Sequence, residues 1–160
     1  MIKFEKISLN QYNKDLGEDR ESEYNSIRLP TKNDVGSAGC DIYANYDVTL
    51  NPKEMVIVKT GLKVSLDNCN QVVKLYTRSS VGIKQHLMLA NTVGIIDASY
   101  YNNKDNEGHL MVALYNYGEQ ERTIKAGEKY AQAVIVPVYT DTNCEILNAT
   151  RDGGIGSSGK

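Results

Sequence analysis

The segment NTVGIIDASYYNN, residues 91–103, joins an apolar run to an acid and then to two tyrosines. Residues 93–96 have the composition of a β-strand, and Asp97 stands where that strand is predicted to end. After two intervening residues come Tyr100 and Tyr101. A carboxylate at the end of a rigid strand has a fixed position, which suits a group that orients a reacting water. The segment therefore predicts a strand whose end holds functional side chains.

Short runs rich in Val, Ile, Tyr and Thr recur on both sides of this segment, with turn signals between them. Several runs alternate with a period of two, and no long segment has helical periodicity. The strands predicted in this way are residues 47–50, 55–60, 71–77, 86–90, 110–116, 122–124 and 131–139. The pattern predicts an all-β sandwich, jelly roll or barrel. We expect only short helices: one turn after Arg78 and a weak helix within Leu9–Leu16.

Two regions have a different composition. Residues 10–26 are polar and of mixed charge, which predicts a surface loop or a frayed segment. Residues 151–160, RDGGIGSSGK, are too poor in apolar groups to pack alone and predict a flexible glycine-rich arm after a single β domain of residues 1–150. The last seven residues resemble a phosphate-binding loop, but the sequence ends at Lys160 without the Ser or Thr and the helix that such a loop requires. A glycine arm can still bind phosphate through backbone N–H groups.

Composition limits the classes of partner. A formal net charge of −2 gives no broad basic field, so we expect no nucleic-acid polymer as a partner. No apolar run has the length of a membrane span or a signal peptide, so no membrane association is expected. The three cysteines, Cys40, Cys69 and Cys144, are widely spaced and odd in number, which favours free thiols in a reducing compartment. We therefore expect a cytoplasmic protein.

Two further motifs contain candidate binding residues. In YTRSSVGIK, residues 76–84, Arg78 offers a fork for phosphate or carboxylate, and Ser79 and Ser80 offer hydroxyl groups. Taken alone, the motif is more typical of an ordinary strand-to-turn junction in which a serine caps a helix. In SAGCDIYA, residues 37–44, Asp41 is either a turn-forming residue or a ligand of hydrated Mg²⁺ through water. The histidines, His86 and His109, have no metal-ligand spacing, and we expect structural or surface roles for them.

The order of the motifs resembles the five motifs of the trimeric dUTPase family. They are AGCDIYA (38–44), RSSVGIK (78–84), NTVGIIDASYY (91–101), GEKYAQAVIVPV (127–138) and RDGGIGSSG (151–159). The resemblance spans roughly residues 29–159. It implies a jelly roll, or distorted β-barrel, that assembles as a homotrimer with active sites between subunits and a flexible C-terminal arm over each site. The implied reaction is hydrolysis of dUTP to dUMP and pyrophosphate with Mg²⁺.

The resemblance also implies roles for individual residues. Asp97 matches the acid that holds the attacking water, Tyr100 the ring that packs under the deoxyribose, and Asn91 the residue that reads the uracil edge. Asp41 matches the acid near the metal, as an outer-shell contact through water. The implied substrate-binding residues are Arg78, Ser79, Ser80, Asn91, Gly94, Tyr100, Gln132, Arg151, Gly153, Gly154, Ile155, Gly156 and Ser157.

The sequence departs from the family pattern at several places. Ile155 stands where a stacking phenylalanine is usual, and the spacing from Arg151 to the following glycines is short. Ser80 replaces a common glycine, and Ser99 replaces a frequent acid. The run NNKDNEGH, residues 102–109, is longer than usual, which predicts an extended turn at the molecular surface.

Two other functions remain open. A dCTP deaminase is similar in fold and often contains Arg-Ser-Ser, but its reaction needs a glutamate at the place that Ala113 occupies in HLMVALYN, and a methyl group transfers no proton. A protein that keeps this fold and acts through protein contacts, with residues 10–26 as the contact surface, is the other alternative.

Overall fold

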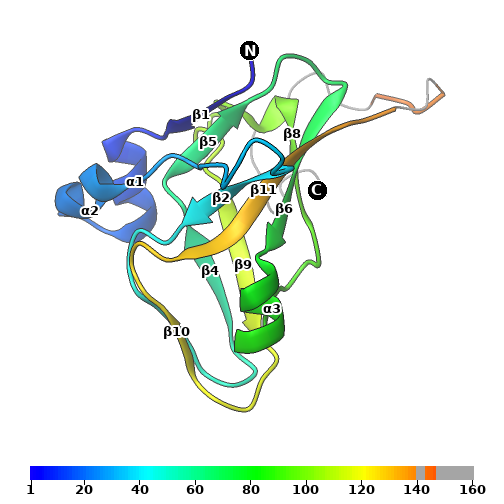
Figure 1. Ribbon diagram of the computed structural model, residues 1–160. Coiled ribbons are helices and arrows are strands. Elements are labelled where there is room, and N and C mark those ends of the chain that lie inside the picture. Colours follow the sequence, from blue (N-terminus) through cyan, green and yellow to red (C-terminus); the bar gives the residue numbers. More distant parts are fainter. Residues whose placement is uncertain (140–142, 147–160) are drawn as a thin grey trace.

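A computed structural model describes residues 1–139 and 143–146 (Figure 1). The described residues are mainly strands, which confirms the predicted all-β class. The strands are β1 (Lys3–Lys6), β2 (Gly39–Tyr43), β3 (Val48–Leu50), β4 (Met55–Lys59), β5 (Leu62–Ser65), β6 (Gln71–Thr77), β7 (Leu87–Leu89), β8 (Gly94–Asp97), β9 (Met111–Asn116), β10 (Arg122–Ile124) and β11 (Lys129–Pro137). The helices are α1 (Leu9–Leu16), α2 (Glu21–Ser26), α3 (Ser79–Gln85) and the 3-10 turn η1 (Ala98–Tyr100).

Two antiparallel sheets enclose one hydrophobic core, in the manner of a distorted jelly roll. One sheet has the strand order β2-β11-β6-β8, and the other has the order β4-β9-β7. Two short pairs, β1-β5 and β3-β10, complete the β-structure. Alternation along each strand turns one set of side chains inward, such as Val73 and Leu75 of β6 and Leu114 of β9, which are all buried. Each buried aliphatic side chain of this size stabilises the fold by about 1.5–3 kcal/mol.

The outer face of the four-stranded sheet holds several of the predicted site residues. Residues directly opposite each other in an antiparallel pair point to the same face. Gln132 of β11 lies opposite both Asp41 of β2 and Tyr76 of β6. Further along, Val72 of β6 lies opposite Asp97 of β8. Asp41, Gln132 and Asp97 therefore share one face of one sheet.

The strand that was predicted to end in Asp97 does so. β8 begins at Gly94, opposite Leu75, and ends at Asp97, and η1 follows at once. A Cβ atom at Gly94 would lie 3.0 Å from the Cβ atom of Leu75, so a side chain at this position would push β8 away from β6. The strand, its acid and the tyrosine after it thus occupy fixed places on the core.

The prediction of a loop at residues 10–26 is wrong. The segment forms α1 and α2, which lie together against one side of the β-structure (Figure 1). Ser8 caps α1 by accepting a hydrogen bond from the N–H of Gln11, and Tyr12 in α1 is fully buried. So short a helix has little stability of its own, and tertiary packing around Tyr12 stabilises it. The weak helix predicted within Leu9–Leu16 is present with those bounds.

The prediction of a surface turn at residues 102–109 is also wrong in part. The segment is a turn, but the side chains of Asn103, Asn106 and His109 are buried. They are polar groups that other polar groups satisfy in the interior, and a composition rule treats them as exposed.

The remaining predictions differ from the structure mainly at element ends. β6 and β10 have the predicted bounds, and five other predicted strands differ by one or two residues. Strands β1, β2 and β5 were not predicted, since they are short and include charged or polar residues. The single turn expected after Arg78 is the longer helix α3. The three cysteines are free, as expected.

Among the residues that the structure describes, no helix is long and apolar enough to cross a membrane. The predicted arm of residues 151–160 lies outside the described residues.

Candidate functional site

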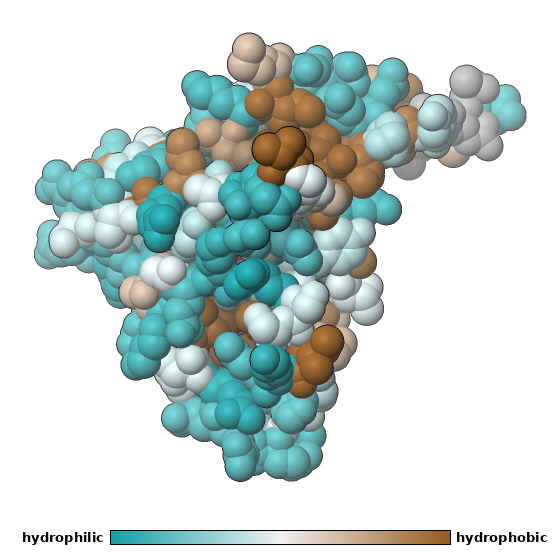
Figure 2. Space-filling view, in the orientation of Figure 1, coloured by the Kyte–Doolittle hydropathy of each residue, from teal (hydrophilic) through white to brown (hydrophobic). Residues whose placement is uncertain are grey.

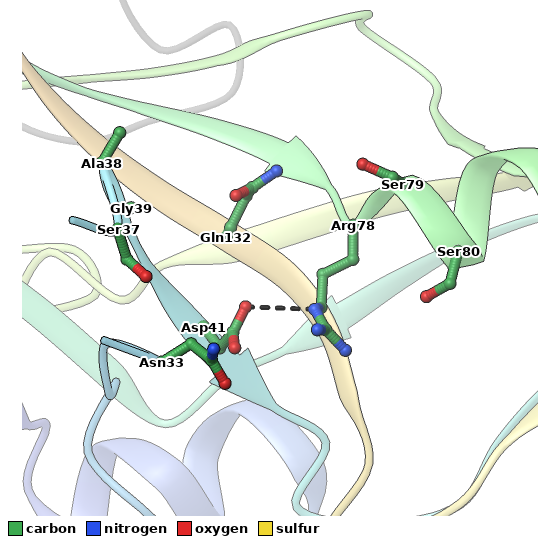
Figure 3. A pocket seen from close by; sticks show the side chains of 9 residues that line it. All are labelled: Asn33, Ser37, Ala38, Gly39, Asp41, Arg78, Ser79, Ser80 and Gln132. Atoms are coloured by element: carbon green, nitrogen blue, oxygen red, sulfur yellow. Dashed lines mark ion pairs between the residues drawn. The ribbon is translucent and has the colours of Figure 1, made fainter. Parts of the chain in front are cut away.

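A polar pocket of about 460 Å³ opens where β2, β11 and the junction of β6 with α3 meet (Figure 3). Its lining residues are Asn33, Ser37, Ala38, Gly39, Asp41, Arg78, Ser79, Ser80 and Gln132. The structure thus brings together five residues that the sequence singled out from three separate motifs: Asp41, Arg78, Ser79, Ser80 and Gln132. Asn33 and Ser37 also line the pocket, and the sequence analysis did not single them out as binding residues.

An acid between two cations organises this pocket. The Nε of Arg78 lies 3.1 Å from one carboxylate oxygen of Asp41, and the Nζ of Lys129 lies 2.9 Å from the other. In Figure 3 the Asp41 carboxylate and the Arg78 guanidinium face each other. Among the lining residues, the charges of Arg78 and Asp41 balance, and Lys129, which contacts Asp41 without lining the pocket, adds one positive charge. The serine hydroxyls add hydrogen-bond donors. The pocket can therefore bind an anion with several oxygens.

Lys129 is a functional candidate that the sequence analysis missed. It lies at the start of β11, where the pairing with β2 shifts register before Ala131. Its signal was weak, because a lysine after Gly127 and Glu128 in a tight turn is an ordinary surface residue. Only the ion pair with Asp41 distinguishes it.

A metal fits this pocket only through water. The described residues contain no group of three or more His, Cys, Asp or Glu side chains that could hold a metal ion. Both oxygens of Asp41 form ion pairs with cations, so the carboxylate is not arranged as a direct ligand. A carboxylate has about four lone-pair sites, which leaves room for a water between Asp41 and a hydrated cation. The donor set fits an outer-shell contact.

Gln132 is held in the pocket by close backbone packing. A Cβ atom at Gly39 would lie 3.3 Å from the Oε1 atom of Gln132 and 3.2 Å from the carbonyl oxygen of Ala133. Glycine at this position lets β2 approach β11, and so brings the side chain of Gln132 beside Asp41.

A second pocket, of about 450 Å³, is neutral. Its lining residues are Met55, Ile57, Ala90, Asn91, Gly94, Ile95, Ile96, Tyr100, Met111 and Ala113. The structure thus brings Asn91, Gly94 and Tyr100 together, as the sequence predicted. An amide beside an aromatic ring and aliphatic side chains can receive a flat, uncharged polar group. Among the described residues, no Asp, Glu, His, Lys or Arg lines this neutral pocket.

Asp97 lies on the other side of Ile95. It lines a third pocket, of about 600 Å³, together with residues that include Lys74, Ile95 and Ser99. Ile95 lines both the neutral pocket and this Asp97 pocket. The acid and the neutral pocket are therefore neighbours.

Asp97 and the polar pocket are far apart within one chain. Three inter-strand steps separate β8 from β2, and Asp97 lies opposite Val72 in the row of Val136, four residues along β11 from Gln132, which faces Asp41. At about 4.8 Å per strand and about 3.4 Å per residue, Asp97 and Asp41 are roughly 20 Å apart. One small molecule cannot place a single reacting atom at both.

The predicted arm residues, Arg151, Gly153, Gly154, Ile155, Gly156 and Ser157, lie outside the described residues. Their predicted roles stay predictions.

The fold and the pockets define a jelly-roll protein suited to a small molecule with a charged half and a neutral half. The dUTPase family model matches residues 25–159. The chain therefore belongs to the dUTPase family.

Individual relatives agree with that assignment. The chain is 40% identical over 136 residues to a deoxyuridine 5′-triphosphate nucleotidohydrolase of Lactococcus lactis, a match that covers 83% of this chain and 89% of that one. It is 38% identical over 142 residues to the Hahella chejuensis protein of the same name, covering 84% of this chain and 89% of that one. The crystal structure of dUTPase from Streptococcus mutans has a TM-score of 0.71 and 31% identity, over 88% of this chain and 98% of that one.

Proposed function

We propose that this protein hydrolyses dUTP to dUMP and pyrophosphate, at sites shared between copies of the chain in a homotrimer. The observation that supports it best is the neutral pocket, in which Asn91, Gly94 and Tyr100 meet beside Asp97. Membership of the dUTPase family supports the same substrate.

The nucleoside half of the substrate occupies the neutral pocket. The amide of Asn91 offers both a donor and an acceptor to the edge of uracil, and the Tyr100 ring lies under the deoxyribose. Because the lining residues that the structure describes are all uncharged, recognition there depends on shape and hydrogen bonds.

The phosphate half occupies the polar pocket of another copy. Arg78, Lys129 and the hydroxyls of Ser79 and Ser80 neutralise and hold the phosphate oxygens. Asp97 orients a water toward the α-phosphorus, and its place at the end of β8 keeps the attack in line. The bond to the leaving pyrophosphate then breaks, and the oxygen from water stays on dUMP.

The distance within one chain supports the shared site. Asp97 and Asp41 share a sheet face but are roughly 20 Å apart, so the two halves of one nucleotide need two chains. The surface near Asp97 also suits burial: Ile95 is 50% exposed, and Figure 2 shows a hydrophobic patch near β8 and β11 on a face that is otherwise mostly hydrophilic.

Mg²⁺ accompanies the triphosphate in this proposal. When bound, the ion would neutralise charge on the phosphate oxygens. Asp41 would hold it through water, and its direct partners remain Arg78 and Lys129.

The residues of the neutral pocket favour this reaction over deamination. Ala113 lines the pocket that would receive the base, and no glutamate is among the described lining residues. The test is to incubate the protein with dUTP, dCTP, dTTP or UTP and Mg²⁺, and to assay pyrophosphate and ammonia. Pyrophosphate from dUTP in preference to the other three is the expected result. Ammonia from dCTP would establish the deaminase instead.

A complementation experiment tests the shared site. Asp97→Asn and Arg78→Ala chains are each expected to be nearly inactive. Coexpressed in equal amounts, they form mixed trimers in which some sites take Asp97 from one chain and Arg78 from its neighbour. Random mixing in a cyclic trimer restores about one quarter of the sites. No recovery in verified mixed trimers would mean that each site lies within one chain.

A further inference from the structure

The two segments whose structure differs from the sequence prediction, residues 10–26 and 102–109, contact each other. Glu107 accepts hydrogen bonds from the backbone N–H of Ser8, at 3.0 Å, and from its hydroxyl, at 2.6 Å. The Nζ of Lys14 in α1 donates to the carbonyl oxygen of Asp105 at 3.0 Å. The start of the chain is thus fastened to the turn that follows Tyr100.

The hydroxyl of Tyr100 is fixed on the inner side of this turn. It donates to the carbonyl oxygen of His109 at 2.9 Å and accepts from the Nδ2 of Asn106 at 2.8 Å. The Nδ2 of Asn103 also donates to the backbone oxygen of Tyr100 at 2.8 Å. The residue is only 5% exposed, yet its ring lines the neutral pocket. The hydroxyl of Tyr100 and its backbone oxygen are therefore both constrained.

The asparagines that hold Tyr100 are themselves fully engaged. The Oδ1 of Asn106 accepts from the Nδ2 of Asn103 at 2.8 Å and from the N–H of Gly108 at 3.0 Å. Gly108 has a φ of +81°, and a Cβ atom there would lie 2.7 Å from the backbone oxygen of Tyr100. A buried polar network in which each member is satisfied is rigid, and it allows one arrangement of its side chains.

His109 connects this network to α1. Its Nε2 accepts from the N–H of Gly61 at 2.8 Å, so the ring is neutral and its proton is on Nδ1. Nδ1 donates to the carboxylate of Asp15 in α1 at 2.6 Å. The side chain of His109 is completely buried. Residues 1–24, which include α1, lie outside the stretch that the family model matches. This chain therefore has a support for the turn beyond the part that defines its family.

We infer that Asn106, and through His109 the helix α1, are positioning elements that hold the Tyr100 ring in place and so set the discrimination against a ribose 2′-hydroxyl. The inference rests on the proposed function, because it assigns the ring to the sugar. A yielding apolar surface rejects an added hydroxyl poorly, so an aromatic ring excludes it only if the ring cannot move aside. The hydrogen bonds to the Tyr100 hydroxyl prevent that movement.

The test compares two buried asparagines. Asn106→Ala removes the donor to the Tyr100 hydroxyl and leaves the ring present. Asn116→Ala is the matched control, because Asn116 is also fully buried and organises a turn, through bonds to Leu50, Gln120 and Gly118. For each variant, kcat/KM is measured with dUTP and with UTP, and the melting temperature is recorded.

Asn106→Ala is expected to lower the preference for dUTP over UTP by about tenfold, the scale of one lost hydrogen bond. Asn116→Ala is expected to lower the melting temperature similarly and to leave the preference unchanged. Asp15→Ala, which releases α1 from His109, is expected to cause a smaller loss of preference. Tyr100→Phe keeps the ring without its hydroxyl and should lose preference as Asn106→Ala does, so it serves if Asn106→Ala fails to fold.

The possible failures are distinct. A wild-type protein that does not hydrolyse dUTP contradicts the proposed function. Suppose instead that the wild type prefers dUTP and that Asn106→Ala or Tyr100→Phe prefers dUTP to the same extent as the wild type. That result overturns only the inference. An equal loss of preference in Asn106→Ala and Asn116→Ala also overturns it, since general loosening would then explain the effect.

Discussion

The polar pocket and the surroundings of Tyr100 hold their side chains by opposite means. In the polar pocket, Asp41 lies between Arg78 and Lys129, and both cations are partly exposed. Around Tyr100, neutral asparagines and a neutral histidine are buried and bonded to one another. Ion pairs near solvent hold the polar pocket, whereas hydrogen bonds between neutral, buried groups hold Tyr100.

The difference matches the demands of the two halves of a nucleotide. A triphosphate is multiply charged, and the pyrophosphate formed from it must leave after reaction. Cations that already have a counter-ion can exchange that counter-ion for phosphate oxygens. A sugar is selected by the absence of one hydroxyl, which requires a surface that does not adapt. Charge near solvent tolerates rearrangement, whereas a satisfied buried network does not.

Asp97 belongs to neither region, and its substitution should have the largest effect. We expect Asp97→Asn to lower turnover by about 10²–10⁴, the usual scale for a lost general base, because an amide cannot accept the proton of the attacking water. The melting temperature should change little, since Asp97 is exposed. Single-turnover kinetics with dUTP measure the effect. Near-normal turnover in the variant would remove Asp97 from the mechanism.

Tyr100→Ala tests the neutral region directly. Loss of the ring opens space under the sugar, and we expect activity on UTP relative to dUTP to rise by about 10- to 100-fold. The neighbouring Tyr101 provides the control, because its hydroxyl bonds to Glu5 and it does not line the neutral pocket. Tyr101→Ala should keep the wild-type ratio. If Tyr100→Ala kept it too, the sugar would be tested elsewhere.

Asp41→Asn tests the charged region. A neutral amide cannot balance the positive charges of Arg78 and Lys129. The Arg78 guanidinium is then no longer oriented by an ion pair, and the KM for dUTP should rise about tenfold. The control is Asp47→Asn, whose carboxylate pairs with Lys125 at an exposed site outside the polar pocket. Titration with Mg²⁺ separates two roles of Asp41. An unchanged half-saturation by Mg²⁺ indicates that Asp41 acts mainly on the cations, and a raised one indicates that it also holds the ion.

The sequence predicted the charged region better than the neutral network. Arg78, Asp41 and Gln132 stand in short motifs whose residue types suggest their chemistry, and β6 has its predicted bounds because a run of β-branched residues is a local signal. Asp97 at the end of β8 follows from the same kind of local pattern. These features depend on a few consecutive residues.

The network around Tyr100 depends on tertiary contacts, and local sequence patterns did not predict it. Asn103, Asn106 and His109 are polar residues in a glycine-containing run, which is typical of an exposed turn. Their burial is possible only because they satisfy one another and because Asp15 of α1 reaches His109. The prediction for residues 10–26 was wrong for the same reason, because the polar composition of the segment did not indicate that the ring of Tyr12 is buried.

The smallest predicted effect is a dependence of stability on pH that comes from His109. Burial lowers the pKa of His109 below its ordinary value, although Asp15 acts in the opposite direction. Lys59 also lowers this pKa, and Glu107 raises it. Above the ordinary pKa, His109 is neutral in the folded and the unfolded chain, and its contribution to stability does not change with pH. Below that value the unfolded chain binds a proton that the folded chain does not, so stability falls as the pH falls.

The loss of stability should therefore begin as the pH falls below about 6.5. His109→Gln can replace both ring contacts, because its amide oxygen can accept from Gly61 while its NH₂ donates to Asp15. Thermal unfolding at pH 7.0 and 5.5 should therefore show a shallower dependence for His109→Gln than for the wild type. Equal slopes for the two proteins would mean that His109 is protonated in the folded state, in which case Gly61 could not donate to its Nε2.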